Sequence, residues 1–213
     1  MTTLIVVRHG FSLSNAERRY TGQQDVSLSP EGFAQAELVA DYLCTNLPPD
    51  AIYSSDLCRA MNTVEPTAKR LGLSVIPDTG LRETDVGRWT GRVYEEVCET
   101  EREYMDRHRA DPDVPCPGGE SRRQVFDRVI ASVRRILAEN ESKTILLATH
   151  AMPARCIECY AAGGGADRVS EFKVSPNAAL HIYTFTDGHL RSAGPNIVSH
   201  LEKPGERLPS DLV

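Results

Sequence analysis

The sequence has neither a long hydrophobic run nor an export leader. None of its segments approaches the roughly 20 consecutive apolar residues that a membrane-spanning helix needs. Its 213 residues are 40% hydrophobic and 25% charged, as in ordinary globular proteins. The apolar residues 4–7 follow the N-terminus almost at once, without a basic leader or a small-residue cleavage site. We therefore expect a cytoplasmic protein that does not enter a membrane.

An excess of positive charge is also missing. The chain carries 24 Lys and Arg residues against 30 Asp and Glu residues, which gives a formal net charge of −6. Long-range repulsion argues against nucleic acid or an anionic membrane as the main partner of such a chain. Any anion that it binds must be held by a local group of arginines.

The cysteines do not have the spacing of a disulfide framework. All six are scattered over predicted helices and loops, which suits a reducing compartment. Cys156 and Cys159 have the spacing of half a zinc site, but zinc needs two further ligands and no second pair lies nearby. We expect both thiols to pack as small apolar groups, and we expect no metal and no other cofactor.

The sequence does contain an alternation of apolar strands with helices. Buried strands are predicted at 3–9 and 144–149, and two further strands at 51–55 and 75–76. The alternating run 179–185 turns at Asp187-Gly188 into a second extended run, which predicts an antiparallel hairpin. This order predicts an α/β fold with a mostly parallel sheet.

Serine caps mark the starts of two predicted helices. Ser29, followed by Pro30, starts a helix that should run to about residue 46, and Ser121 starts a second one. A helix at about 56–71 should be disturbed at Pro66. The segment 93–109 should be one charged helix with few apolar positions. The chain length fits a single domain, 1–213, with a lid or insertion at about 84–120.

Two of the predicted strands lead into a histidine. His9 ends the first strand, and His150 follows the strand at 144–149. In an open parallel sheet the ligand crevice lies outside the carboxyl ends of the strands, so we expect both imidazoles in one pocket. Arg8, Arg59 and Glu83 are expected at the same edge. Because guanidiniums match phosphate oxygens in pairs and stay charged, this group predicts a phosphate-binding pocket.

Each of these residues, taken alone, has an ordinary structural explanation. A histidine at a strand end is more often a hydrogen-bonded structural residue, and a lone arginine is usually a solvated charge. Together they have a chemical explanation. An imidazole with a free ring nitrogen can attack phosphorus, and a protonated carboxyl can give a proton to the departing alkoxide. His9 is then the candidate nucleophile and Glu83 the candidate acid.

Several motifs follow one another in the order of a known family. They are RHGFSLSN (8–15), TG (21–22), LSPEG (28–32), SSDLCRA (54–60), LRE (81–83), PGGES (117–121) and TH (149–150). With Trp89, Asn177 and the stretch 196–201, they make nearly the whole chain resemble the histidine phosphatase superfamily, the phosphoglycerate mutase-like proteins. The resemblance implies a three-layer α/β/α sandwich and a metal-independent reaction through a phosphohistidine.

The resemblance also implies a role for each site residue. His9 would be the nucleophile, and Glu83 the general acid and then the base that activates water. The residues implied in binding the phosphoryl group or the substrate are Arg8, Asn15, Thr21, Gly22, Arg59, His150 and Ala151. Ala151 stands where the family usually has glycine, so the backbone approach to the phosphate is expected to differ slightly. No predicted catalytic group is lost.

Three functions remain open on the sequence. The resemblance favours a phosphomonoester hydrolase of the histidine acid phosphatase type, acting on a small phosphorylated metabolite. The alternatives are a cofactor-dependent phosphoglycerate mutase and a catalytically inactive phosphate-binding module. Arg18, Arg19 and Arg88 are candidates to favour a second anionic group on the substrate. The natural substrate and the oligomeric state, including a homodimer, are not determined by the sequence.

Overall fold

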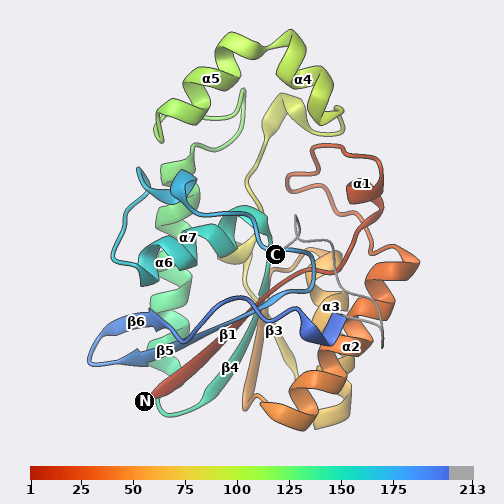
Figure 1. Ribbon diagram of the computed structural model, residues 1–213, viewed down its shortest axis with the longest axis vertical. Helices are drawn as coiled ribbons and strands as arrows, with labels where there is room; N and C mark the ends of the chain where they lie inside the picture. Colours follow the sequence, from red (N-terminus) through yellow and green to blue (C-terminus); the bar gives the residue numbers. More distant parts are fainter. Residues whose placement is uncertain (202–213) are drawn as a thin grey trace.

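A six-stranded sheet forms the centre of the molecule. The computed structural model describes residues 1–201, and the strand order is β3-β2-β4-β1-β5-β6 (Figure 1). The parallel strands are β1 (Thr2–Arg8), β2 (Ala51–Ser54), β3 (Val75–Pro77) and β4 (Thr144–Thr149). The antiparallel strands at one edge are β5 (Leu180–Thr186) and β6 (His189–Ser192). The mostly parallel sheet and the terminal hairpin are thus confirmed.

Helices cover both faces of the sheet. One face carries α2 (Pro30–Asn46) and α3 (Cys58–Leu71), and the other carries α6 (Arg122–Glu139) and α7 (Ala151–Ala161) (Figure 1). The short helix α1 (Leu13–Ala16) follows β1, while α4 (Tyr94–Thr100) and α5 (Arg102–Ala110) lie beyond the end of the sheet. None of the helices within residues 1–201 is long and apolar enough to cross a membrane.

Strand β1 shows how the two core layers arise. Leu4 and Val6 belong to the apolar cluster with α6 and α7, whereas Ile5 and Val7 belong to the cluster with α2 and α3. All four side chains are at most 2% exposed. Successive side chains of a strand point to opposite faces, so an unbroken apolar run fills both layers. This arrangement confirms the three-layer α/β/α sandwich.

The serine caps act as predicted. The hydroxyl of Ser29 accepts a hydrogen bond from the Gly32 N–H, at 3.1 Å, with Pro30 in the first helical position. Ser121 and Gln124 form a reciprocal capping box at the start of α6. Such caps satisfy N–H groups that have no partner inside the helix, each contributing about 1 kcal/mol.

Two predicted helices differ from the structure. The charged segment 93–109 is broken at Glu101, whose carboxylate accepts hydrogen bonds from Trp89 Nε1, at 2.9 Å, and from Arg92. Pro66 does not end the helix at about 56–71, because α3 continues through it to Leu71. Pro66 and Asn62, whose carbonyl loses its helical donor, both lie at the surface, where water can satisfy that carbonyl.

The segment between β3 and α6 has an apolar cluster of its own. It comprises Val86, Trp89, Val97, Met105 and Cys116. The cluster is separate from the two core layers of the sheet, and α4 and α5 lie beyond the carboxyl ends of the parallel strands (Figure 1). In an open parallel sheet this end holds the ligand crevice.

Candidate active site

His9 lies directly after β1 and lines a cavity of about 810 Å³. Its Nδ1 lies 2.8 Å from the carbonyl oxygen of Gly10. Because a carbonyl can only accept, Nδ1 carries the proton, which leaves a lone pair on Nε2. Burial lowers the pKa of His9 well below its ordinary value, and the charges of Arg8 and Arg59 lower it further. The imidazole is therefore neutral, with a nucleophilic nitrogen.

The backbone around His9 is held from two sides. The Gly10 N–H donates to Thr63 Oγ1, at 2.9 Å, and Asn177 Nδ2 donates to the His9 carbonyl, also at 2.9 Å. A Cβ on Gly10 would lie 2.7 Å from the carbonyl oxygen of Gly32, so only glycine fits there. The sequence offers no signal for Thr63, which adjoins no strand-end histidine, and the family resemblance includes Asn177 without giving it a role.

Arg59 joins three parts of the site. It is 1% exposed and donates to the carbonyls of Gly22 and Gln24, both at 2.8 Å. Its Nε also donates to His150 Nδ1, at 3.2 Å. The bond to Gly22 ties the predicted substrate loop to α3. Among residues 1–201 no carboxylate forms a salt bridge with Arg59, so its charge is available to a bound anion.

His150 lies directly behind the cavity wall. Because its Nδ1 accepts from Arg59, the proton is on Nε2, which donates to Ser55 Oγ at 2.8 Å. The ring is fully buried, and its centroid lies 5.1 Å from that of His9. Burial and the nearby Arg59 charge lower the pKa of His150 well below its ordinary value. The two histidines thus meet as predicted, but both nitrogens of His150 are already bonded within the protein.

Glu83 lies in the cavity wall, and its carboxylate contacts the first residues of α7. Its carboxylate accepts from the N–H groups of Thr84 (2.8 Å), Ala151 (3.1 Å) and Met152 (3.3 Å). The N-terminus of a helix carries partial positive charge, which favours an acceptor at this position. The backbone N–H of Ala151 therefore holds Glu83.

Arg128 fixes the segment that carries Glu83. From α6 it donates to the carbonyls of Gly80, Arg82 and Glu83, at 2.7–2.9 Å. Its guanidinium also donates to both carboxylate oxygens of Glu120, at 2.7 and 2.9 Å. Both side chains are about one fifth exposed, at 21% and 22%. The sequence did not predict these contacts of Arg128, because this arginine lies 45 residues after Glu83 and outside the LRE motif (81–83).

The remaining predicted residues also line the cavity. Arg8 donates from Nη1 to the Ser175 carbonyl, at 2.6 Å, and its buried Nε has no hydrogen-bond partner in the described part of the chain. Asn15 Oδ1 accepts from the Ser12 N–H, at 3.0 Å, in the capping box of α1. Thr21 and Gly22 lie along the same wall. The fold has brought residues from five separate segments together.

One wall of the cavity is largely aromatic. Side chains from the segment 84–120 and from the loop before α2 contribute Tyr20, Trp89, Tyr94, Met105 and His108. Trp89 is 1% exposed and packs edge-on against His108, with ring centroids 5.6 Å apart. Sequence reasoning left His108 without a role, and the structure places it at the cavity surface.

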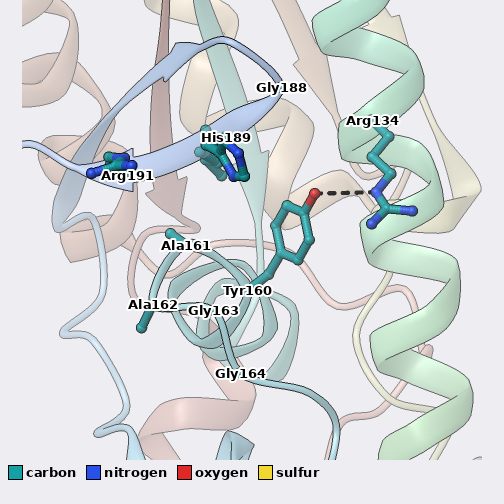
Figure 2. A pocket seen from close by; sticks show the side chains of 10 residues that line it. Arg134, Tyr160, Ala161, Ala162, Gly163, Gly164, Gly188, His189 and Arg191 are labelled. Atoms are coloured by element: carbon teal, nitrogen blue, oxygen red, sulfur yellow. Dashed lines mark hydrogen bonds between the residues drawn. The ribbon is translucent and has the colours of Figure 1, made fainter.

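Other features of the described chain carry no comparable chemistry. Cys156 and Cys159 are fully buried in the core, so the prediction that they pack as apolar groups is confirmed. Within residues 1–201 no group of three His, Cys, Asp or Glu side chains could hold a metal ion. A second hollow, of about 580 Å³, contains Tyr160, whose hydroxyl accepts from Arg134 Nε at 3.1 Å (Figure 2). None of the predicted catalytic residues lines this hollow.

A neutral histidine stands beside a carboxyl and two guanidiniums that have no ion pair within residues 1–201, at the carboxyl ends of parallel strands. This arrangement defines a phosphoryl-transfer protein. The model of the histidine phosphatase superfamily (branch 1) matches residues 4–197. The chain belongs to this family.

Named relatives include both a mutase-like protein and phosphatases. The chain is 34% identical over 211 residues to phosphoglycerate mutase-like protein 4 of Arabidopsis thaliana, covering 95% of this chain and 88% of that protein. It is 35% identical over 164 residues to phosphoserine phosphatase 1 of Hydrogenobacter thermophilus, covering 76% and 77%. A mutant phosphoserine phosphatase from Entamoeba histolytica, in complex with phosphoserine, superimposes with a TM-score of 0.83 at 26% identity, covering 95% and 100%.

Proposed function

We propose that this chain hydrolyses the phosphomonoester of a small metabolite through a phosphohistidine formed on His9. The observation that carries the proposal is the tautomer of His9: the proton is on Nδ1, and Nε2 is left with a lone pair in the cavity. Family membership and the phosphoserine phosphatases among the relatives support hydrolysis.

The first step transfers the phosphoryl group to the protein. His9 Nε2 forms a bond to phosphorus while the phosphorus–oxygen bond of the ester breaks, and the carboxyl of Glu83 gives its proton to the departing oxygen. Arg8 and Arg59 offset the charge on the phosphoryl oxygens, with Asn15 and the Thr21-Gly22 loop alongside. His150 acts through Arg59, because its Nδ1 accepts from Arg59 Nε and holds that guanidinium in place, while Ser55 keeps the proton of the ring on Nε2.

The second step returns the protein to its starting state. The Glu83 carboxylate removes a proton from water, whose oxygen bonds to phosphorus as the bond to Nε2 breaks. Inorganic phosphate leaves and His9 is neutral again. We propose that the segment 84–120 covers the site as a lid within a single domain.

The two other functions make different demands on this site. A mutase returns the phosphoryl group to a second alcohol instead of water, and one relative is named mutase-like. Incubation with 3-phosphoglycerate and a trace of the bisphosphate tests this directly, since rapid formation of 2-phosphoglycerate would replace hydrolysis as the function. A phosphate-binding module without turnover would bind phosphate but release none from p-nitrophenyl phosphate or a panel of phosphomonoesters.

Covalent labelling tests the mechanism. We expect substrate carrying ³²P to give an acid-labile label on the native protein and none on His9→Ala. Glu83→Gln should still be labelled by p-nitrophenyl phosphate, because its leaving group needs no proton, but turnover should slow by about 10²–10⁴-fold. The exposed His189 gives a matched control, since His189→Ala should label normally. A label that persists in His9→Ala contradicts the mechanism.

A further inference from the structure

The arginines of the cavity fall into two groups. Arg18 lies 2.6 Å from Glu95, Arg19 lies 2.8 Å from Glu17, and Arg109 lies 3.9 Å from Asp106. These charges are already matched by carboxylates. Three arginines that line the cavity have no such carboxylate among residues 1–201: Arg8, Arg59 and Arg155.

Two of the three unpaired charges belong to the phosphoryl site. Arg8 adjoins His9 in the chain, and Arg59 contacts His150. A phosphoryl group at His9 uses both. Arg155, on α7, is the third unpaired arginine, and no step of the proposed reaction requires it.

Arg155 is held in one orientation by backbone carbonyls. Its Nε donates to the Phe172 carbonyl, at 2.8 Å, and its Nη2 to the Val169 carbonyl, at 3.0 Å. Neither partner is charged, and Nη1 makes no bond to residues 1–201. A guanidinium fixed on one edge, with donors free on the other, is preorganised for a carboxylate or phosphate.

The position of Arg155 places it on the leaving-group side of the site. The first N–H groups of α7 hold Glu83, and Arg155 follows Ala151 by one turn. Arg155 and Glu83 line the same cavity, and they are close enough for Glu83 to act electrostatically on the guanidinium. In the proposed reaction Glu83 protonates the departing oxygen, so the alcohol part of the substrate lies beside Arg155.

The charge of Arg155 is costly where it is. The side chain is partly buried, and burial lowers its pKa, although a guanidinium stays charged at any physiological pH. Arg122, close enough to act on it, has the same sign, while the carboxylates of Glu83 and Glu158 lie beyond salt-bridge range. A charge that is partly removed from water without a counter-ion gains most from an anionic ligand.

We propose that Arg155 binds a second anionic group, carboxylate or phosphate, on the alcohol part of the substrate. The proposal rests on the hydrolase function given above and adds its substrate class: phosphomonoesters that carry another negative charge a few bonds from the ester oxygen. Arg18 and Arg19 are exposed to water and already have carboxylate neighbours, so an anionic ligand gains less from them than from the partly buried Arg155.

Matched substrates test the proposal. 3-Phosphoglycerate and glycerol 3-phosphate differ in one carboxylate, and fructose 1,6-bisphosphate and fructose 1-phosphate differ in one phosphate. We expect native protein to prefer the doubly anionic member of at least one pair, and the preferred pair identifies the second anion. Arg155→Met should lower kcat/KM for that member about 10- to 100-fold, the loss expected for a charge-assisted hydrogen bond. The partner substrate and p-nitrophenyl phosphate should change less than threefold.

A merely structural role gives a different result. If Arg155→Met loosened the 169–172 loop, all substrates would decline by one common factor, which overturns the proposal. Arg155→Lys, which keeps the charge, should recover part of the preference, and Arg18→Met should keep all of it. A native protein without any preference also overturns the proposal while leaving hydrolysis intact. Calorimetry with the His9→Ala protein measures how tightly each member of a pair binds, without turnover. It therefore tests the second-anion site even if the native protein proves not to be a hydrolase.

Discussion

Replacing Arg128 by methionine should damage both stability and one particular step of catalysis. The substitution keeps the helical stem but removes three hydrogen bonds to the carbonyls of residues 80–83 and two to Glu120. Glu120 would keep only its bonds from the Asp85 N–H, at 2.8 Å, and from Gln23, at 3.5 Å. Its carboxylate would be left half-buried without a counter-charge.

The magnitude follows from the exposure of the pair. Breaking a fully buried ion pair costs about 3–5 kcal/mol. With both side chains about one fifth exposed, solvent screening reduces this to about 2–3 kcal/mol. For a chain of this length, 1 kcal/mol corresponds to about 2–4 °C in Tm, so Arg128→Met should lower Tm by about 5–10 °C. Arg123→Met is the control: Arg123 lies on the same helix as Arg128, and the loss of its exposed ion pair with Asp113 should cost less than about 1 kcal/mol.

The stability difference should depend on pH. Burial raises the pKa of Glu120, but the Arg128 and Asp85 hydrogen bonds outweigh it and bring the pKa below its ordinary value. A lowered pKa in the folded state stabilises the protein above the ordinary Glu pKa of about 4.3, and the contribution disappears as pH falls through the folded pKa. The difference in unfolding free energy between native protein and Arg128→Met should therefore shrink below about pH 4.

The catalytic effect should depend on the leaving group. Arg128 acts through the Glu83 segment, so Arg128→Met should slow alkyl phosphates, which need a proton on the departing oxygen, about tenfold more than p-nitrophenyl phosphate. Steady-state kinetics at a temperature well below the lowered Tm measures this. An equal loss for both substrates, or a Tm unchanged from that of Arg123→Met, would refute the reasoning.

Three further outcomes follow from the site geometry. Because burial and the neighbouring guanidiniums lower the pKa of His9, kcat/KM corrected for substrate ionisation should not fall as pH decreases through about 6.5; a fall there in the pH–rate profile would contradict a neutral nucleophile. Ser55→Ala leaves His150 Nε2–H without its acceptor and should cost about 1–3 kcal/mol in urea unfolding. Gly87→Ala, whose Cβ would lie 2.3 Å from a backbone oxygen at φ +51°, should lower Tm more than Gly91→Ala, which has φ +80° and open space around it.

Local sequence signals predicted the framework well, because each acts over a few residues. The apolar run of β1, the serine caps and the Asp187-Gly188 turn all gave the elements that the structure contains. The signals failed where a distant partner decided the outcome. The break at Glu101 depends on Trp89, twelve residues away in sequence, and no periodicity within 93–109 contains that bond.

The sequence by itself indicated that His9, Arg59, Glu83 and His150 would lie at one sheet edge, since each follows a predicted strand of a mostly parallel sheet. Only the tertiary structure decided how each one is used. It placed the proton of His9 on Nδ1, turned both nitrogens of His150 towards protein partners, and tied Glu83 to the start of α7. These outcomes depend on hydrogen bonds between segments many residues apart, whose geometry exists only after the chain has packed.

The same division holds for the arginines. The sequence shows how many charges there are, and Arg18, Arg19 and Arg88 looked as available as any other. The folded chain paired Arg18 and Arg19 with carboxylates, left Arg88 out of the cavity wall, and kept Arg155 without a counter-charge beside Glu83. Whether an arginine is free to bind a ligand depends on its distance from the nearest carboxylate, and the fold sets that distance.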